Sequence, residues 1–173
     1  MALKLSKDFK ELEKQIRKDV HAAVEETLQD EVFEVVRDVV LERVGEDVYG
    51  VYTPTVYKRR RDDKGLKDKD KVVQKLGGNA TEKECRSLFV WNAARYNPYN
   101  PLTNAPYFPS REGAENLQKL IIDGYKGYKG NDPPYYHPRP FIEKASEALD
   151  GDDRGKLEKA FENGLGKRGL IKK

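Results

Sequence analysis

The chain has 173 residues, a length that suits one domain of ordinary size, predicted to span residues 1–173. Charged residues make up 36% of the chain and the hydrophobic set only 37%, so the core is expected to be thin and partly supplied by other chains. A content of 10% aromatic residues exceeds that of disordered sequences. The composition therefore predicts a folded protein that oligomerises.

The charges are segregated along the chain rather than spread evenly. The net charge is only +3, which excludes a generically basic coat for nucleic acid. Residues 1–47 hold 8 basic and 13 acidic side chains, whereas residues 58–75 hold 9 basic and 4 acidic ones. A chain with one acidic and one basic segment can meet a copy of itself with complementary potentials, which favours ordered assembly.

Cysteine content and hydropathy indicate the cellular compartment in which the protein is expected. The single cysteine, Cys85, excludes an internal disulfide and is typical of a reducing cytoplasm. Residues 1–8 lack the apolar stretch of a signal peptide, and no window holds the roughly 18 apolar residues that a membrane span needs. We therefore expect a protein made in the cytoplasm without contact to a membrane.

Residues 1–46 predict one long amphipathic helix. Ser6 is placed to cap its start and Gly45 to end it, and a break near residues 29–30 remains possible. The stripe predicts a face directed at the core, and a coiled-coil partner is the alternative. Apolar residues recur every three or four positions, at Phe9, Leu12, Ile16, Val20, Val24, Leu28, Val32, Val35, Val36, Val39, Val40 and Val44.

A charged hairpin is predicted next. Residues 48–57 are rich in β-branched and aromatic side chains and predict a strand, with Pro54 at a kink or an unpaired edge. The basic run 58–61 and a turn at residues 62–65 follow. Residues 66–76 alternate Lys and Asp before an apolar stretch, so the hairpin tip is expected to be exposed to solvent.

The middle of the chain predicts a short element and then an extended arm. Thr81 and Glu84 have the spacing of a capping box, and residues 85–94 suit a short helix or a strand. Residues 95–110 contain four prolines, which exclude a helix or a central strand. Because this stretch also holds Tyr96, Tyr99, Tyr107 and Phe108, we expect an ordered arm that packs onto another surface.

The C-terminal part predicts helices. One helix is expected over residues 110–122 and extended backbone over the proline-containing residues 135–142. Two further helices, 143–149 and 154–165, are separated by Gly151.

The last residues, 164–173, are rich in Gly and Lys and predict a frayed tail. Together these elements predict an α+β fold. It comprises a long N-terminal helix, a small antiparallel sheet with a charged hairpin, a middle helix, C-terminal helices and an extended arm.

Catalytic motifs are scarce. His21 and His137 stand apart, and the sequence holds no paired Cys-x-x-Cys, no His-Glu-x-x-His and no Gly-rich phosphate loop. A metal-dependent nuclease built from Asp and Glu alone stays open, but we expect no enzyme, no cofactor and no metal.

Nucleic-acid binding is the alternative function. The basic segment 58–75 follows Tyr52 and Tyr57, and cations beside aromatic rings are typical of single-strand binders. The acidic residues Asp62, Asp63, Asp68 and Asp70 interrupt this segment and oppose phosphate. A solvated hairpin or a subunit contact explains the segment better.

Two stretches carry a family resemblance. Residues 52–60, Tyr-Thr-Pro-Thr-Val-Tyr-Lys-Arg-Arg, with Gly-Leu at 65–66, resemble a segment of tailed-bacteriophage neck and tail-completion (head–tail joining) proteins. Residues 120–124, Leu-Ile-Ile-Asp-Gly, followed by Pro-Arg-Pro-Phe-Ile at 138–142, are similar to the ending of that family. Residues 77–110 match no pattern of the family.

The resemblance implies a structural virion protein in the phage neck. It implies a homo-oligomeric ring of six- or twelve-fold symmetry around the DNA channel, between the portal or adaptor and the tail terminator or tail tube. DNA would pass without sequence-specific contacts.

Candidate subunit or partner contacts are Tyr52, Pro54, Tyr57, Arg59, Arg60, Arg61, Tyr96, Tyr99, Tyr107, Phe108, Arg139 and Phe141. For the last two residues a structural role is the alternative. In that interpretation Phe141 fills the core beneath the sheet, and Arg139 pairs with a carboxylate on a helix.

Overall fold

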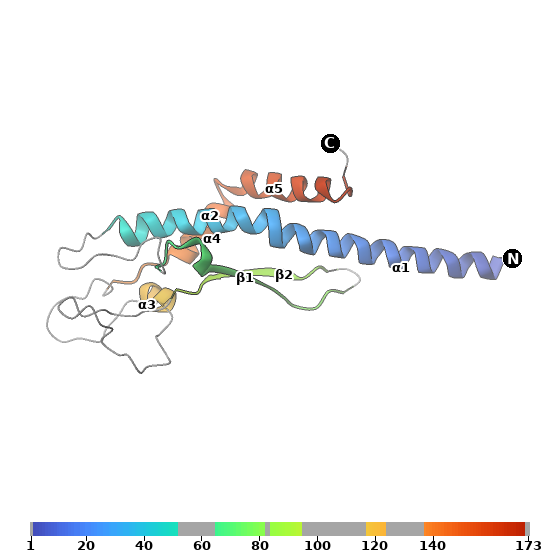
Figure 1. The fold of residues 1–173 in the computed structure, drawn as a ribbon, viewed down its shortest axis with the longest axis horizontal. Helices are drawn as coiled ribbons and strands as arrows, with labels where there is room; N and C mark the ends of the chain where they lie inside the picture. Colours follow the sequence, from blue (N-terminus) through green and yellow to red (C-terminus); the bar gives the residue numbers. More distant parts are fainter. Residues whose placement is uncertain (1, 52–64, 82–83, 95–116, 124–136, 172–173) are drawn as a thin grey trace. The chain divides into compact units, whose positions relative to one another are not determined.

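The computed structural model describes residues 2–51, 65–81, 84–94, 117–123 and 137–171 (Figure 1). The predicted α+β class is confirmed, with a long N-terminal helix, a small sheet and later helices.

The chain divides into two compact units. Unit 1 combines residues 1–35, 74–89 and 154–173, and unit 2 combines residues 36–73 and 90–153. Each unit joins segments that are far apart in the sequence. The predicted single domain over 1–173 stays a prediction.

The predicted long helix is confirmed and runs further than expected. Its segments are α1 (Ala2–Thr27), the π-helical η1 (Leu28–Val32), α2 (Phe33–Arg43) and the π-helical η2 (Val44–Tyr49). Helical structure begins at Ala2, so Ser6 lies inside the first turns and does not cap their start.

Gly45 does not end the helix, since it lies inside η2 and its carbonyl accepts the Gly50 N–H at 2.8 Å. A glycine ends a helix when it adopts a left-handed conformation, and Gly45 does not. Near residues 29–30 the helix changes its winding in η1 instead of breaking.

The sheet has two antiparallel strands, β1 (Val72–Gly77) and β2 (Ser87–Asn92). Just beyond their ends the Ala93 N–H donates to the Lys71 carbonyl at 2.6 Å. The prediction paired residues 72–76 with a strand over 48–57, which is wrong at its start because Val48 and Tyr49 are helical. Gly50 and Val51 are not in a strand either, and residues 52–57 lie outside the described residues. Val48 continues the buried helical spacing, which outweighs its β preference.

The turn between the strands uses the predicted capping pair in another way. The Glu84 N–H donates to Thr81 Oγ1 at 3.1 Å, and the Thr81 N–H donates to the Glu84 carbonyl at 2.9 Å. Ser and Thr side chains make the same local bond in turns and at helix starts. The sequence pattern therefore closes a turn before β2 rather than starting a helix.

Unit 2 contains most of the buried apolar side chains. Asn92 is fully buried, donates through Nδ2 to the Leu66 carbonyl at 2.6 Å and accepts the Ala94 N–H at 2.9 Å. A buried amide with its hydrogen-bonding groups paired fixes the loop before β1 against the end of β2. The apolar core of this unit comprises Val39, Val40, Leu41, Val44, Val48, Leu66, Val72, Ala94, Leu117, Ile121, Phe141 and Ala145.

The predicted C-terminal helices are present, although residues 110–116 of the first one lie outside the described residues. They are α3 (Leu117–Asp123), α4 (Phe141–Asp150) and α5 (Arg154–Lys167), the last two separated at Gly151. The extended backbone predicted over residues 135–142 is wrong at its end, because α4 already begins at Phe141. The sequence predicts a frayed tail from residue 164, whereas α5 continues to Lys167 and buries Gly164.

In unit 1, α5 lies beside α1 and η1 (Figure 1). Gly164 faces Thr27, which is fully buried and donates its hydroxyl to the Ala23 carbonyl at 2.7 Å. A Cβ at position 164 would overlap the Thr27 side chain and lie 2.7 Å from Glu31 Oε2. The two helices therefore approach closely because residue 164 has no side chain.

We predict that Gly164→Ala lowers the free energy of unfolding by about 1–3 kcal/mol, since the added methyl group separates α5 from α1. Chemical denaturation followed by circular dichroism measures the change. The matched control is Gly155→Ala in the same helix, where nothing lies within 4 Å of the new Cβ, and it is expected to be neutral or slightly stabilising. Equal stability of the two variants would contradict the close contact.

Candidate functional site

The first half of α1 exposes a stripe of large apolar side chains. Phe9, Leu12 and Ile16 are 63%, 55% and 53% exposed, and every residue from 8 to 19 is exposed. At about 3.6 residues per turn these three side chains project from one face of the helix. The sequence prediction of a core-facing stripe is therefore wrong for this part of the helix. It is confirmed for the second half, where Val32, Val39, Val40 and Val44 are buried.

The exposed stripe continues under α5. Phe9 and Thr27 are eighteen positions apart, which is about five helical turns, so they lie on the same face of α1. That face is covered by α5 at Thr27 and is open at Phe9, Leu12 and Ile16. We call these three residues the α1 stripe. It is the uncovered end of a surface whose other end is an internal helix–helix contact.

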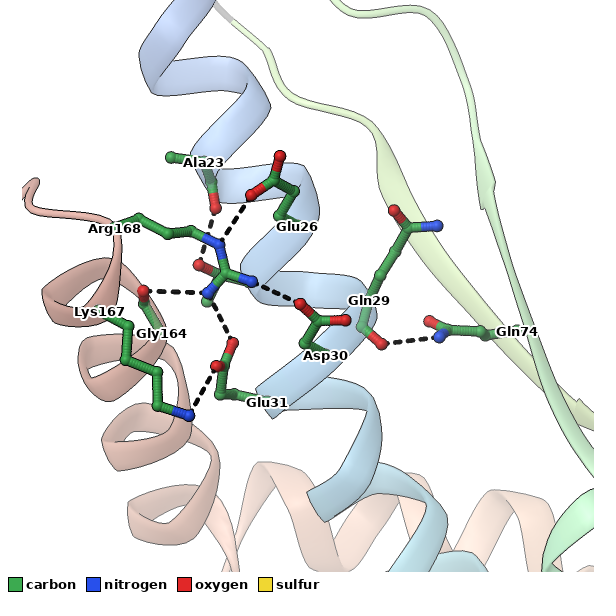
Figure 2. Close-up of polar contacts among 10 residues, drawn as sticks. Ala23, Glu26, Gln29, Asp30, Glu31, Gln74, Gly164, Lys167 and Arg168 are labelled. Carbon is green, nitrogen blue, oxygen red and sulfur yellow. Dashed lines mark hydrogen bonds and ion pairs between the residues drawn. The ribbon is translucent and has the colours of Figure 1, made fainter.

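Arg168 holds α5 at the covered end. Figure 2 shows its guanidinium among three carboxylates of the α1–η1 helix. Nε donates to Glu26 Oε2 at 3.1 Å, Nη1 to Glu31 Oε2 at 2.8 Å and Nη2 to Asp30 Oδ2 at 2.5 Å. Its side chain is only 15% exposed. We call Arg168 and these three carboxylates the Arg168 clamp.

Further polar contacts complete the clamp. Arg168 Nη1 also donates to the Gly164 carbonyl at 3.1 Å, which ties the guanidinium to its own helix. Lys167 Nζ donates to Glu31 Oε1 at 3.0 Å, so that carboxylate has a cation on each oxygen. The π-helical winding of η1 turns less per residue than an α-helix, which brings Asp30 and Glu31 closer to one face.

The clamp shifts the pKa values of its two most enclosed groups. Burial alone would raise the pKa of Glu31, but hydrogen bonds from Lys167 and Arg168 outweigh it and hold that pKa below its ordinary value of 4.5. Burial alone would lower the pKa of Arg168, but its bonds to Glu31 and Glu26 raise it. Both shifts favour the charged pair.

The sheet is attached to the same helix. Gln74 Nε2 on β1 donates to the Gln29 carbonyl in η1 at 2.7 Å (Figure 2). Arg86 Nε lies 3.6 Å from Glu25 Oε1. All of these contacts lie within unit 1 and toward the C-terminal side of the α1 stripe. These contacts hold residues 25–31 of the first helix, whereas no described residue covers the α1 stripe.

Of the candidate contacts predicted from sequence, the structure describes Arg139 and Phe141. Phe141 is fully buried at the start of α4, which favours its alternative role in the core. Arg139 donates from Nη1 to the Val48 carbonyl at 3.3 Å, so its guanidinium lies at the C-terminal end of the long helix, where a cation is favourable. The other ten lie outside the described residues: Tyr52, Pro54, Tyr57, Arg59, Arg60, Arg61, Tyr96, Tyr99, Tyr107 and Phe108.

The part of the chain that the structure describes shows no candidate metal site or membrane-spanning helix. No group of three or more His, Cys, Asp or Glu side chains there is arranged to hold a metal ion. Cys85 is half-buried. Among the described helices, none is both long and apolar enough to cross a membrane.

Comparison with known proteins identifies a family. The family model described as YomN matches residues 8–167, which is most of the chain. The chain belongs to the YomN family. Membership supports an association with bacteriophage. No curated protein and no solved structure matches the chain.

Two features of this YomN-family chain were missed by sequence reasoning. Arg168 and Gly164 lie in the segment predicted to fray. The sequence did hold a signal for Arg168, because the four acidic residues between positions 25 and 31 of the first helix favour basic partners. The open end of the α1 stripe was also missed. The regular spacing of apolar residues does not show how much of the stripe another helix covers. Because α5 is shorter than α1, it covers only part of the stripe.

We predict that Arg168→Met destabilises the YomN-family chain by about 1–2 kcal/mol, because it leaves the enclosed Glu31 without one of its two cations. The control Arg154→Met breaks an exposed pair with Glu158 on α5 and is expected to cost less than about 0.5 kcal/mol. Urea denaturation at neutral pH compares the two. A larger loss for Arg154→Met would contradict the clamp.

The clamp also predicts a dependence on pH. Because the pKa of Glu31 is lower in the folded state than in the unfolded chain, its contribution is fully present above pH 4.5 and is lost as the pH falls below that value. Glu31→Gln is therefore expected to have a lower Tm than the parent chain at pH 7. Near pH 3 the difference in Tm between the two chains is expected to be smaller. A constant difference in Tm between pH 7 and pH 3 would contradict this role of Glu31.

Proposed function

We propose that the protein is a structural component of a phage particle, a neck or tail-completion subunit that forms a ring around the DNA channel. It joins the portal or adaptor protein to the tail terminator or tail-tube protein. The observation that carries the proposal is the α1 stripe: three large apolar side chains on one face of a helix whose base is held by the Arg168 clamp. Membership of a phage-associated family supports the setting.

An exposed apolar stripe favours assembly over catalysis. A folded chain seldom leaves large apolar side chains in a continuous row at helical spacing unless another surface covers them. A closed ring requires that one face of each subunit meets a different face of the next one. The segregation of acidic residues into 1–47 and basic ones into 58–75 suits such a contact.

The assembly function requires no reaction and no cofactor. In this proposal the protein has a structural role. It is made in the host cytoplasm and is then incorporated into the neck of the virion. DNA passes through the channel without sequence-specific contacts.

The described part of the basic segment adds nothing to the nucleic-acid alternative. Lys67, Lys69 and Lys71 alternate with Asp68 and Asp70, and Asp68 accepts the Asp70 N–H at 3.0 Å in a 3₁₀ turn. Carboxylates interleaved with the lysines oppose a phosphate backbone. This pattern suits a solvated turn.

We expect a phage that lacks this protein to accumulate DNA-filled heads and separate tails, counted by negative-stain electron microscopy of infected-cell lysates. Supplying the parent chain in trans restores joined particles. The variant Leu12→Glu, which places a charge in the α1 stripe, fails to restore them. The control Lys18→Glu alters the opposite face of the same helix and is expected to restore them.

Joined, infectious particles formed at normal yield without the protein would overturn the proposal. So would the absence of the protein from purified particles measured by mass spectrometry. Equal complementation by Leu12→Glu and Lys18→Glu would show that the stripe has no part in joining.

A further inference from the structure

We infer that η1 is a winding switch controlled by α5. Docked α5 holds the π turn of η1, and release of α5 lets this turn rewind to an α-helix, which rotates the α1 stripe about the helix axis. The inference goes beyond the proposed function and does not depend on it, because every residue that carries it lies in unit 1.

The backbone of η1 holds one residue more per turn than an α-helix. The Phe33 N–H donates to the carbonyls of Leu28 and Asp30, five and three positions earlier. In an α-helix its acceptor would be the carbonyl four positions earlier, at Gln29. That carbonyl accepts the Gln74 side-chain amide of β1 at 2.7 Å (Figure 2). The acceptor that α winding would use is therefore satisfied from outside the helix.

The Arg168 clamp fits the π winding of η1. Glu26 and Glu31 are five positions apart, so on an α-helix their side chains would point about 140° apart around the axis. A π turn, which pairs residues five apart, brings both to one face. In the structure one guanidinium reaches both, with Nε 3.1 Å from Glu26 Oε2 and Nη1 2.8 Å from Glu31 Oε2. Docked α5 therefore makes a contact that α winding would break.

This contact couples the docking of α5 to the winding of η1. A two-state element shifts by as much as a ligand differs in its binding to the two states, and docked α5 is such a ligand within the chain. π-helical turns are rare on their own, so release of Arg168 removes the main preference for one here. The remaining bond from Gln74 is neutral and weaker than the charged contacts of the clamp.

Rewinding turns the α1 stripe about the helix axis. Leu12 and Val32 are twenty positions apart, which places them about 200° apart on a continuous α-helix. Because the π turn holds one extra residue, this angle is smaller by about 100° in the structure. With α5 docked, the stripe therefore lies about a quarter turn from the direction of the buried Val32. After release it lies on nearly the opposite side of the helix.

The switch lets a partner of the stripe act on α5. Coupling between two sites is reciprocal, so a protein that binds the stripe in only one of its two directions must also change the docking of α5. Docked α5 in turn sets the direction in which the stripe is offered. The clamp and the stripe are therefore two ends of one device, linked through η1.

Distances between spin labels on the two sides of η1 test the inference. In a Cys85→Ser background, one label is attached at Glu34→Cys and the other at Lys18→Cys or Arg17→Cys, all at exposed positions. Residues 18 and 34 point about 60° apart around the π-wound helix and about 160° apart around the α-wound one. Residues 17 and 34 point about 160° and about 100° apart, respectively.

These angles predict different changes for the two label pairs. Rewinding lengthens the 18–34 distance by about 3 Å, because the labels swing apart on a helix about 10–12 Å wide. The 17–34 distance stays within about 1 Å, because its labels swing together while the helix extends. Double electron–electron resonance measures both distances. A simple stretching of the helix would lengthen both alike.

Release of α5 is produced by combining Gly164→Ala with Arg168→Met. This double variant is expected to lengthen the 18–34 distance alone. Arg168→Met by itself is expected to move part of the 18–34 population the same way, so the result does not depend on the folding of the double variant. The matched control combines Gly155→Ala with Arg154→Met on the exposed side of α5 and is expected to leave both distances at their parent values.

Deletion of Gln29 isolates the turn from α5. It removes the extra residue, so an α-wound helix then keeps residues 18 and 34 at the angle that they have in the parent chain. In this background the two α5 substitutions are expected to change neither distance. Circular dichroism establishes that each variant compared is folded.

Three results would overturn the inference. The first is an unchanged 18–34 distance in folded Arg168→Met and in the double variant. The second is equal lengthening of both distances, which would show stretching without rotation. The third is lengthening that persists after deletion of Gln29, which would place the change outside η1. Lengthening of the 18–34 distance alone, abolished by the deletion, supports the switch.

Discussion

The close approach of Gly164 to Thr27 is the contact on which the rest of unit 1 depends. Without a side chain at residue 164, α5 comes near enough to the first helix for Arg168 to reach three of its carboxylates. The same contact decides where the apolar face of α1 is covered and where it is left open. The α1 stripe is a consequence of how far α5 reaches.

The Arg168 clamp fixes position more than it adds stability. A guanidinium with four hydrogen bonds has its donors largely satisfied, and its desolvation offsets much of the attraction to the carboxylates. Removal of one partner is costly because the others stay enclosed. The clamp therefore specifies one arrangement of α5 on η1, at the place where Gly164 lies close to Thr27.

The sequence predicted regular elements well and their contacts poorly. Helical spacing identified the first helix, and Gly151 correctly separated α4 from α5, because periodicity and backbone preference act locally. The strand expected at residues 48–49 was wrong, since burial of Val48 within unit 2 outweighed β preference. Gly164 and Arg168 were missed because their roles depend on residues about 137 positions away. The stripe itself was visible, but its exposure depends on the reach of α5.

The central proposal is that the open end of the first helix is covered by another protein surface in the phage neck. Cryo-electron microscopy of the head–tail junction in intact particles tests it most directly. We predict a ring in which Phe9, Leu12 and Ile16 of each subunit are buried against another protein surface of the junction. A junction that lacks this chain, or a ring in which these three side chains face solvent, would contradict it.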